Sequence, residues 1–261
     1  MFSLKRLDKN REYIYHLLNR MKKFNCPVSI HCEFDITDTM QAIEERRAQG
    51  RPIGFMAYLT KATADAIAIH PHFNNRLYHT LFGKRVVVYE QINCGLLVER
   101  ETPEGKHTLL PLNIYDAPNQ SVEDIHNRIK DYKTKPIEEI KAFQQLSKLD
   151  RIPRWVIPII HFMMRTQPGY NGKVGNTYAI SSVLQRNGAA VGVSAPAYKT
   201  TFFPINIIDK PVVYQGEIAV RTMLQMMISV DHYLADGMDV LRASGTLKEF
   251  LENPETLLGK A

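Results

Sequence analysis

Strand-like and helix-like segments are mixed along this chain without strict alternation, and this order limits the fold more than any other feature. Helical spacing of apolar residues predicts helices at 10–23, 38–47, 55–69, 122–132, 136–146 and 239–252. Alternating or β-branched runs predict strands at 28–37, 84–89, 92–99, 108–112, 177–183, 189–193, 201–208, 212–214 and 217–229. A doubly wound parallel sheet needs regular alternation. We therefore expect a single α/β domain over 1–261, in which a mixed sheet packs against helices.

Composition and motifs exclude several functional classes. Neither G-x-G-x-x-G nor G-K-[ST] occurs after a strand, which argues against dinucleotide and P-loop sites. The formal net charge of +6 is spread along the chain, so we expect no nucleic-acid partner. The three cysteines form no C-x-x-C pair, and we expect neither a disulfide framework nor a metal site. The most apolar run, 155–164, is too short to span a membrane. We expect a soluble, cytoplasmic protein.

The stretch 226–240 (MMISVDHYLADGMDV) is the most informative part of the chain. An apolar strand runs into His232, and Asp236 and Gly237 precede the last helix. An imidazole held at a strand end can act as a base near neutral pH. The alternatives are a structural histidine, with Asp231 and Asp236 capping the turn and the helix, and a weakly supported metal site. Gly237 would allow a sharp turn before the helix.

This stretch resembles the D-H-x-x-x-D-G signature of the dihydrolipoyl acyltransferase catalytic domain, the core of 2-oxoacid dehydrogenase complexes. It is also similar to the H-H-x-x-x-D-G of chloramphenicol acetyltransferase and of condensation domains. Further resemblances to the dehydrogenase family follow in order along almost the whole chain. They are Arg11 in the first helix, CPVS and FDIT in 26–37, HPHFNN in 70–75, a PEG turn at 103–105, TYAIS in 177–181, PIN at 204–206 and FLENPETL in 250–257.

The resemblance implies a role for each matching residue. His232 matches the histidine that takes the proton of the acceptor thiol or hydroxyl. Asp236 matches an aspartate that holds the catalytic loop by pairing with an arginine of the first helix, here Arg11, whose alternative is a solvated helix charge. Ser181 matches the serine that stabilises the tetrahedral oxyanion, and Ser182 is the alternative if the register shifts by one. Cys26 and Val28 match positions that line the acceptor pocket of the chloramphenicol enzyme.

The resemblance also implies a chloramphenicol acetyltransferase-like two-layer sandwich, assembled as a homotrimer or a larger cage of trimers. Its substrates would be acyl-CoA and a small acceptor, with no metal and no membrane. Apolar residues of 202–207 could serve this assembly, or they could be core. We expect no lipoyl or subunit-binding domain in the chain, and Tyr233 replaces the usual basic residue after the histidine. Three functions compete: a stand-alone acyltransferase, an antibiotic acetyltransferase of the chloramphenicol type, and a non-catalytic trimeric scaffold.

Overall fold

The computed structural model describes residues 9–80, 83–103, 105, 107–149, 152–166, 175–182, 184–189 and 199–259. Its α-helices are α1 (Lys9–Phe24), α2 (Thr37–Ala48), α3 (Phe55–Ile69), α4 (Val122–Thr134), α5 (Lys141–Leu149), α6 (Val156–Thr166), α8 (Gly237–Glu252) and α9 (Glu255–Leu258). Its strands are β1 (Pro27–Asp35), β2 (Arg76–Thr80), β3 (Gly83–Val87), β4 (Cys94–Glu101), β5 (His107–Ile114), β6 (Tyr178–Ile180), β7 (Gln185–Arg186), β8 (Thr201–Tyr214) and β9 (Glu217–Asp231).

The main sheet is mixed, as predicted. Its strand order is β1-β9-β8-β6-β4-β5, and β7 also pairs with β8. β1, β9 and β8 are antiparallel neighbours, β6 runs parallel to both β8 and β4, and β5 returns antiparallel to β4. Strands β2 and β3 form a separate hairpin. The strands at the two ends of the chain therefore lie beside each other, because β1 pairs with β9.

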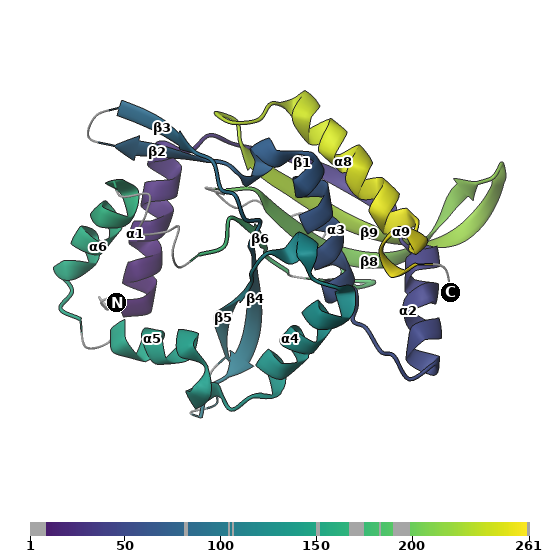
Figure 1. Ribbon diagram of the computed structural model, residues 1–261, viewed down its shortest axis with the longest axis horizontal. Helices are drawn as coiled ribbons and strands as arrows, with labels where there is room; N and C mark the ends of the chain where they lie inside the picture. The colour runs from purple at the N-terminus through teal and green to yellow at the C-terminus, as the bar shows by residue number, and fades with distance from the viewer. Residues whose placement is uncertain are drawn as a thin grey trace, which may run out of the picture.

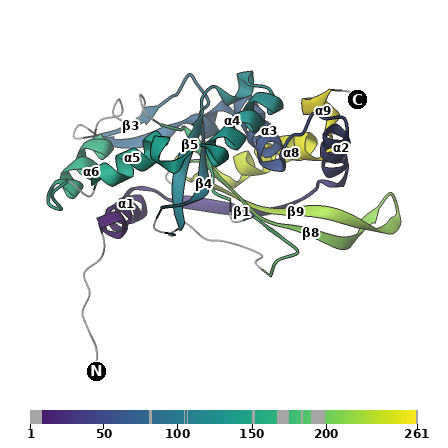
Figure 2. The same ribbon diagram turned by 90° about the horizontal axis from the view of Figure 1, so that it is seen from below.

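The helices form a second layer over one face of the sheet. Figures 1 and 2 show α2, α3, α4 and α8 above the strands, with the long β8–β9 pair below them and projecting beyond the helices. Helices α1, α5 and α6 gather at the opposite end of the molecule. This arrangement confirms the predicted two-layer α/β sandwich.

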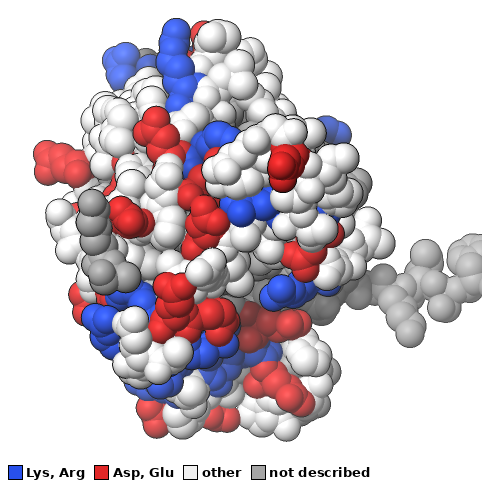
Figure 3. Space-filling view, turned by 90° about the vertical axis from the view of Figure 1, so that its right-hand side faces the viewer, with Lys and Arg blue, Asp and Glu red and all other residues white. Residues whose placement is uncertain are grey.

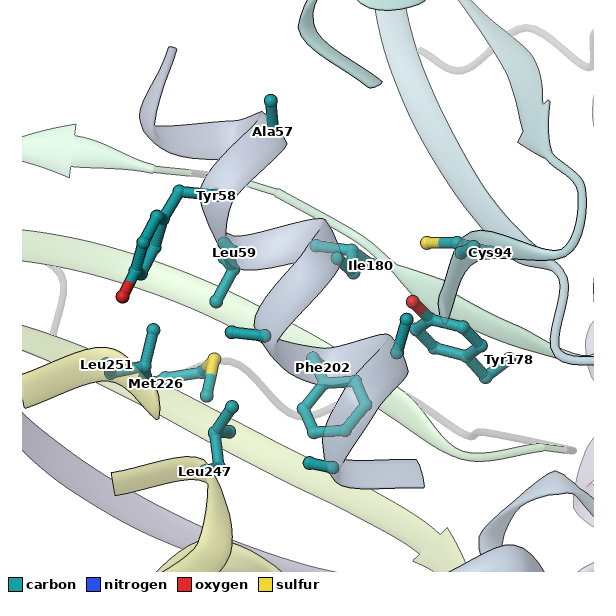
Figure 4. Close-up of a cluster of buried hydrophobic side chains, with 14 of the residues drawn as sticks. Ala57, Tyr58, Leu59, Cys94, Tyr178, Ile180, Phe202, Met226, Leu247 and Leu251 are labelled. Carbon is teal, nitrogen blue, oxygen red and sulfur yellow. The ribbon is translucent and has the colours of Figure 1, made fainter. Parts of the chain in front are cut away.

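Helix α3 occupies the centre of the core. Four of its five alanines are buried, and small side chains let the helix lie close to the sheet. Figure 4 shows α3 between Leu247 and Leu251 of α8 and sheet residues such as Ile180 and Phe202. The hydroxyl of Tyr58 donates to the carbonyl of Phe250 in α8, and burial raises the pKa of Tyr58 to about 12. Tyr58 therefore remains neutral while it ties α3 to α8.

Several predicted element boundaries differ from the structure. The expected helix 136–146 is a 3-10 turn, Ile137–Glu139, followed by α5, because Pro136 starts a new segment. The expected strands 201–208 and 212–214 are one strand, β8, which absorbs Pro204 at an irregularity and Pro211 in its projecting part. The expected strand 177–183 shortens to β6, and 190–193 lie outside the described residues.

Helix α6 and strand β2 were not anticipated from the sequence. α6 takes up most of the apolar run 155–164 and extends to Thr166. Pro158 obscures the helical pattern there, because prolines usually mark helix ends. β2 follows a 3-10 turn at Pro71–Asn74 and is short and polar. Across the described ranges, no helix is both long enough and apolar enough to cross a membrane.

The apolar residues of 202–207 belong to the interior. Phe202, Phe203, Ile205 and Ile207 are all buried within the chain, so they offer no surface for assembly. Exposed apolar side chains lie further along the β8–β9 pair, at Val213 and Ile218, which are 77% and 81% exposed. Figure 3 views the molecule from the end where this pair projects, and acidic and basic side chains are interspersed over it.

An ion pair between Asp35 and Arg221 connects the end of β1 to β9. Its carboxylate accepts hydrogen bonds from the Thr37 hydroxyl at 2.6 Å and from Arg221 Nε at 2.7 Å. Burial alone would raise the pKa of Asp35, but these hydrogen bonds and the positive charge of Arg221 outweigh burial and lower the pKa. The carboxylate form is therefore the one that stabilises this corner of the fold.

This shift predicts how stability depends on pH. A carboxyl whose folded-state pKa is lowered stabilises the fold above its unfolded pKa, about 3.9, and loses that stabilisation as the pH falls through the folded pKa. We expect Asp35→Asn to be less stable than wild type at pH 7 and to lose less free energy of unfolding between pH 5 and pH 2. Urea unfolding across this range measures the difference, and parallel curves for the two proteins would contradict it.

Candidate active site

The turn between β9 and α8 is fixed to the start of β1. The backbone N–H of His232 donates to the carbonyl of Cys26 at 2.7 Å, which extends the β1–β9 ladder beyond the pair of Pro27 and Asp231. His232 and Cys26 were both predicted site residues, and the structure brings them together. Val28 lies on the same strand, opposite Val230, and packs partly against the core.

The imidazole of His232 has a defined tautomer. Its Nδ1 lies 3.0 Å from the carbonyl oxygen of Ala235. A carbonyl only accepts hydrogen bonds, so Nδ1 carries the proton and Nε2 keeps its lone pair. Within the described part of the chain, Nε2 has no hydrogen-bond partner, and the side chain is exposed. This geometry presents Nε2 to an incoming group as a proton acceptor.

The carboxylate of Asp231 stabilises the turn through hydrogen bonds. It is 4% exposed, and its carboxylate accepts from Asn25 Nδ2 at 2.8 Å and from the N–H of Cys26 at 3.1 Å. The N–H of Tyr233 also donates to it at 3.3 Å. One buried carboxylate thus joins the residues before β1 to the residues after β9. Asp231 thus has the capping role that the sequence offered as an alternative.

Asp231→Ala is expected to lower the free energy of unfolding by about 2 kcal/mol, because several partly buried donors lose their shared acceptor. Equilibrium urea unfolding measures the change. Glu44→Ala, at an exposed acid on α2, is the matched control and should change stability by less than about 0.5 kcal/mol. Equal effects of the two substitutions would mean that Asp231 does not hold the turn.

Asp236 caps α8. Its side chain accepts from the N–H of Asp239 at 2.9 Å, and the side chain of Asp239 accepts from the N–H of Asp236 at 3.1 Å, which completes a capping box. The side chain of Arg11, its expected partner, lies outside the described residues. Gly237 is the first residue of α8, its φ is not positive, and a Cβ there would meet no atom within 4 Å. The sharp turn before α8 therefore does not depend on a positive φ at Gly237.

Ser181 lies just beyond the end of β6. Its backbone N–H donates to the carbonyl of Phe202 at 2.9 Å, and the residue is half-buried. Among the described residues, its hydroxyl has no hydrogen-bond partner. The hydroxyl of neighbouring Ser182, by contrast, accepts from the N–H of Leu184 at 3.2 Å. Among the described residues, the Ser181 hydroxyl is thus available to bind a ligand, whereas the Ser182 hydroxyl already accepts a hydrogen bond from the backbone.

Ser181 and His232 stand far apart within one chain. Ala179 is level with Thr201, and Thr201 is level with Ser229. Ser181 lies two residues beyond this level along β6, whereas His232 lies three residues beyond it in the opposite direction along β9. The two side chains are therefore about 16 Å apart along the strands and about 10 Å apart across them. A single chain cannot place both on one small reacting group.

A cleft of about 680 Å³ lies beside Ser182. Met56, Val98 and Ile129 contribute apolar lining, from α3, β4 and α4 respectively. Glu99 and Lys133 place opposite charges along it. The sequence did not indicate this cleft, because it opens only where β6 ends early and, among the described residues, leaves the second half of β4 unpaired on that side.

Cys94, which is buried, and Cys32, which is half-buried, do not provide nucleophiles. Burial raises the pKa of Cys94 to about 12 and also raises the pKa of Cys32, so both thiols stay protonated near neutral pH. In the described ranges, no three His, Cys, Asp or Glu side chains gather as metal ligands.

The histidine turn also contacts strand β3. Lys84 of β3 lies over the ring of Tyr233, with its Nζ 5.8 Å from the ring centroid, a contact that the sequence did not indicate.

The chain is similar to curated dehydrogenase-complex proteins. It is 24% identical over 234 residues to the dihydrolipoyllysine-residue succinyltransferase component of the 2-oxoglutarate dehydrogenase complex of Staphylococcus aureus. The match covers 87% of this chain and 47% of the relative. The chain thus spans about half the length of the curated relatives it matches.

Solved structures share the fold. Dihydrolipoamide acetyltransferase of Azotobacter vinelandii matches with a TM-score of 0.70 and 18% identity, covering 99% of this chain and 94% of that one. The cubic core of a pyruvate dehydrogenase complex matches with a TM-score of 0.68 and 17% identity over the same shares. A chloramphenicol acetyltransferase matches with a TM-score of 0.50 and 14% identity over 96% of this chain and 98% of the other. The predicted chloramphenicol acetyltransferase-like fold is confirmed.

The family model for the catalytic domain of 2-oxoacid dehydrogenase acyltransferases matches residues 3–148 and 205–259. These residues include Arg11, Cys26, His232 and Asp236, whereas Ser181 falls between the two matched parts. The match covers well over half of the chain, and its second part contains the whole turn that presents His232 and caps α8. This protein therefore belongs to the 2-oxoacid dehydrogenase acyltransferase (catalytic domain) family, whose members are transferases.

Proposed function

We propose that this protein is a CoA-dependent acyltransferase that moves an acetyl or other short acyl group from acyl-CoA to a thiol, hydroxyl or amine. The observation that carries the proposal is the hydrogen bond between His232 Nδ1 and the Ala235 carbonyl, which leaves Nε2 as a base. In the Azotobacter enzyme, a serine, a histidine and an asparagine have been investigated for their role in the catalytic mechanism. Ser181, His232 and Asp236 supply comparable groups here.

The reaction needs one proton acceptor and one oxyanion donor. Nε2 of His232 takes the proton of the acceptor, because a thiol with a pKa of about 8.5 is mostly protonated at pH 7. The acceptor sulfur, or the oxygen or nitrogen of another acceptor, then attacks the thioester carbonyl. The Ser181 hydroxyl donates to the oxyanion that forms. Collapse of this intermediate breaks the C–S bond, and the CoA sulfur leaves with the proton held on Nε2.

The remaining site residues have supporting roles in this proposal. Asp236 caps α8 and holds the turn whose Ala235 carbonyl orients the imidazole. Arg11 of α1 is assigned as its charged partner, and Gly237 follows Asp236 in the same turn. Cys26, which precedes β1 and accepts from the N–H of His232, and Val28 of β1, which lies opposite Val230, are assigned to the acceptor side. In this proposal the acceptor binds near β1, and the thioester of acyl-CoA binds near the end of β6.

The active site is proposed to be shared between chains. The distance between Ser181 and His232 in one chain requires a second copy to bring the serine of one chain to the histidine of the next. A ring of three chains makes this contact three times with one interface, so we propose a homotrimer or a larger assembly of trimers. The similarity to a cubic dehydrogenase core supports an assembly of this kind.

The proposed function is tested by following the release of free CoA thiol from acetyl-CoA. The acceptor panel contains dihydrolipoamide, chloramphenicol, and simple alcohols and amines. Acceptor-dependent release that is lost in Ser181→Ala but retained in Ser182→Ala supports both the reaction and the choice of serine. Losing one oxyanion donor typically lowers kcat by about 10² to 10³.

Other outcomes of this assay identify the competing functions. Release that occurs only with chloramphenicol, together with resistance of a sensitive host, would mean an antibiotic acetyltransferase. Absence of release with every acceptor, together with absence of CoA binding, would mean a non-catalytic scaffold.

A further inference from the structure

Helix α6 and the residue before it have an apolar outer face. Across 155–163, every exposed side chain is apolar: Trp155, Pro158, Ile159, Phe162 and Met163. Steps of three and four residues separate them along the chain, so they share one side of the helix. The exposure reaches 70% at Trp155. A surface helix normally turns its polar residues to the outside, and α6 shows the reverse.

The inner side of α6 is held against α1. Ile157 and His161 are buried on this side. The imidazole rings of His161 and of His16 in α1 lie with their centroids 6.0 Å apart, and Arg154 forms an ion pair with Glu12 of α1. These contacts fix the orientation of α6, so the apolar face is directed away from the protein.

The same end of the molecule carries almost all of the net charge. Figures 1 and 2 show α1, α5 and α6 together at this end. The sequences of these three helices contain eight lysines and arginines and one acid, Glu12. This excess is larger than the net charge of +6 of the whole chain, so the rest of the protein is close to neutral. Basic residues that are spread along the sequence are thus gathered by the fold.

We propose that this end of the protein binds the surface of an anionic phospholipid bilayer, with α6 in the plane of the interface and its apolar face among the acyl chains. Helices that bind in this way combine an apolar face, often with a tryptophan, and basic residues beside it. The exposed lysines Lys22, Lys141 and Lys148 supply attraction to acidic headgroups. The 11 residues of α6 are too few to cross a bilayer, but a helix in the interface does not need to cross it.

A second copy of this chain is the main alternative occupant of the face. Two copies that met face to face through α6 would bring together two strongly basic ends, and repulsion between like charges opposes this contact. α6 also lies outside both parts that the family model matches, so membership of the family gives no reason to place an interface on it. A nucleic acid would use the positive charge and leave the apolar face in water. A bilayer uses both features.

The fluorescence of Trp155 tests the proposal directly, because Trp155 is the only tryptophan of the chain. Wild-type protein is mixed with vesicles of phosphatidylcholine and phosphatidylglycerol. We expect the emission to shift to shorter wavelength, and lipids with brominated acyl chains to quench it. Vesicles of phosphatidylcholine alone should bind more weakly, and added salt should weaken binding to the mixed vesicles, because it screens the headgroup charge.

A pair of substitutions locates the binding surface. We expect Phe162→Glu to weaken partition into the mixed vesicles by about 10-fold or more, since burial of an aromatic side chain contributes at least this much. Ile218→Glu is the matched control, because it places the same charge at an exposed apolar residue on the β8–β9 pair, at the other end of the molecule. This variant should bind as wild type does. Vesicle co-sedimentation measures the partition, and thermal unfolding first shows that both variants are folded.

Three results would overturn the proposal. One is a Trp155 emission that the mixed vesicles leave unchanged, and another is equal partition of Phe162→Glu and Ile218→Glu. The third is a Trp155 emission that shifts with protein concentration without vesicles, together with a lower sedimentation mass of Phe162→Glu. In that case a second copy covers α6.

This inference goes beyond the proposed acyl transfer and can be tested separately from it. None of the residues assigned to the reaction lies in α6. The thiol-release assay without vesicles therefore tests the reaction alone, and Phe162→Glu should keep the kcat of wild type in it. Vesicle binding without acyl transfer would overturn the proposed function and leave the membrane proposal standing.

Discussion

Replacing His232 by Ala is expected to lower kcat for acyl transfer by about 10²- to 10⁴-fold, the usual contribution of a positioned general base. The physical reason is the tautomer that the Ala235 carbonyl imposes, since it leaves Nε2 as the proton acceptor of the turn. CoA binding should change little, because the proposal gives the imidazole a role in moving protons and none in holding CoA. Steady-state kinetics with the acceptor identified by the thiol-release assay measure the effect.

Two controls separate a chemical role of His232 from a structural one. Added imidazole should restore part of the activity of His232→Ala, because a free base can replace the missing one, whereas it cannot repair a misfolded turn. Urea unfolding should show that the variant retains wild-type stability to within about 1 kcal/mol, since the exposed imidazole makes one hydrogen bond. A kcat within threefold of wild type would refute the role of His232 as base.

The second large effect is the recovery of activity when two inactive variants are combined. His232→Ala and Ser181→Ala are each expected to be nearly inactive alone. If each site takes its histidine from one chain and its serine from the next, mixed assemblies contain some sites with both groups. Random mixing of equal amounts should restore about one quarter of the wild-type activity, because each intact group is present with a probability of about one half.

The experiment requires co-expression or refolding together, so that chains exchange before assembly. The double variant His232→Ala/Ser181→Ala mixed with wild type provides the reference, because it dilutes intact sites without creating complementary ones. Activity of the co-expressed single variants that stays at the level of each variant alone would contradict a shared site. That result would mean that Ser181 and His232 act on different groups, or that Ser181 has no role in the reaction.

Local sequence patterns predicted much of the candidate site. The apolar strand, the Asp231–His232 turn and the cap of α8 lie within about fifteen consecutive residues. The hydrogen bonds of His232 Nδ1 and of the α8 cap are local in sequence, whereas those that join Asp231 to Asn25 and Cys26 are not. Asp236 capping α8 follows from the preference of aspartate for helix N-termini, an alternative that the sequence left open and the structure bears out. The resemblance to the acyltransferase family rests on these local motifs, and the family match confirms it.

Other expectations depended on contacts that side-chain patterns do not encode. The sequence left open whether the residues of 202–207 are core or assembly surface, and only the packing of β8 in the sheet buries them. Gly237 was expected to allow a sharp turn before the helix, and the structure makes it the first residue of α8 with no positive φ. α6 and β2 were missed because a proline and a polar strand conceal their periodicity.

The sequence by itself determined the family, the mixed α/β class and the residues of the histidine turn, because each depends on spacing within one segment. Only the tertiary structure decided that β6 stops after three residues, that a cleft opens beside β4, and that Ser181 and His232 lie far apart along the sheet within one chain. The physical reason is that strand order and register arise from pairing between residues far apart in the chain. Periodicity shows which face of a strand is apolar, but not which strand lies beside it.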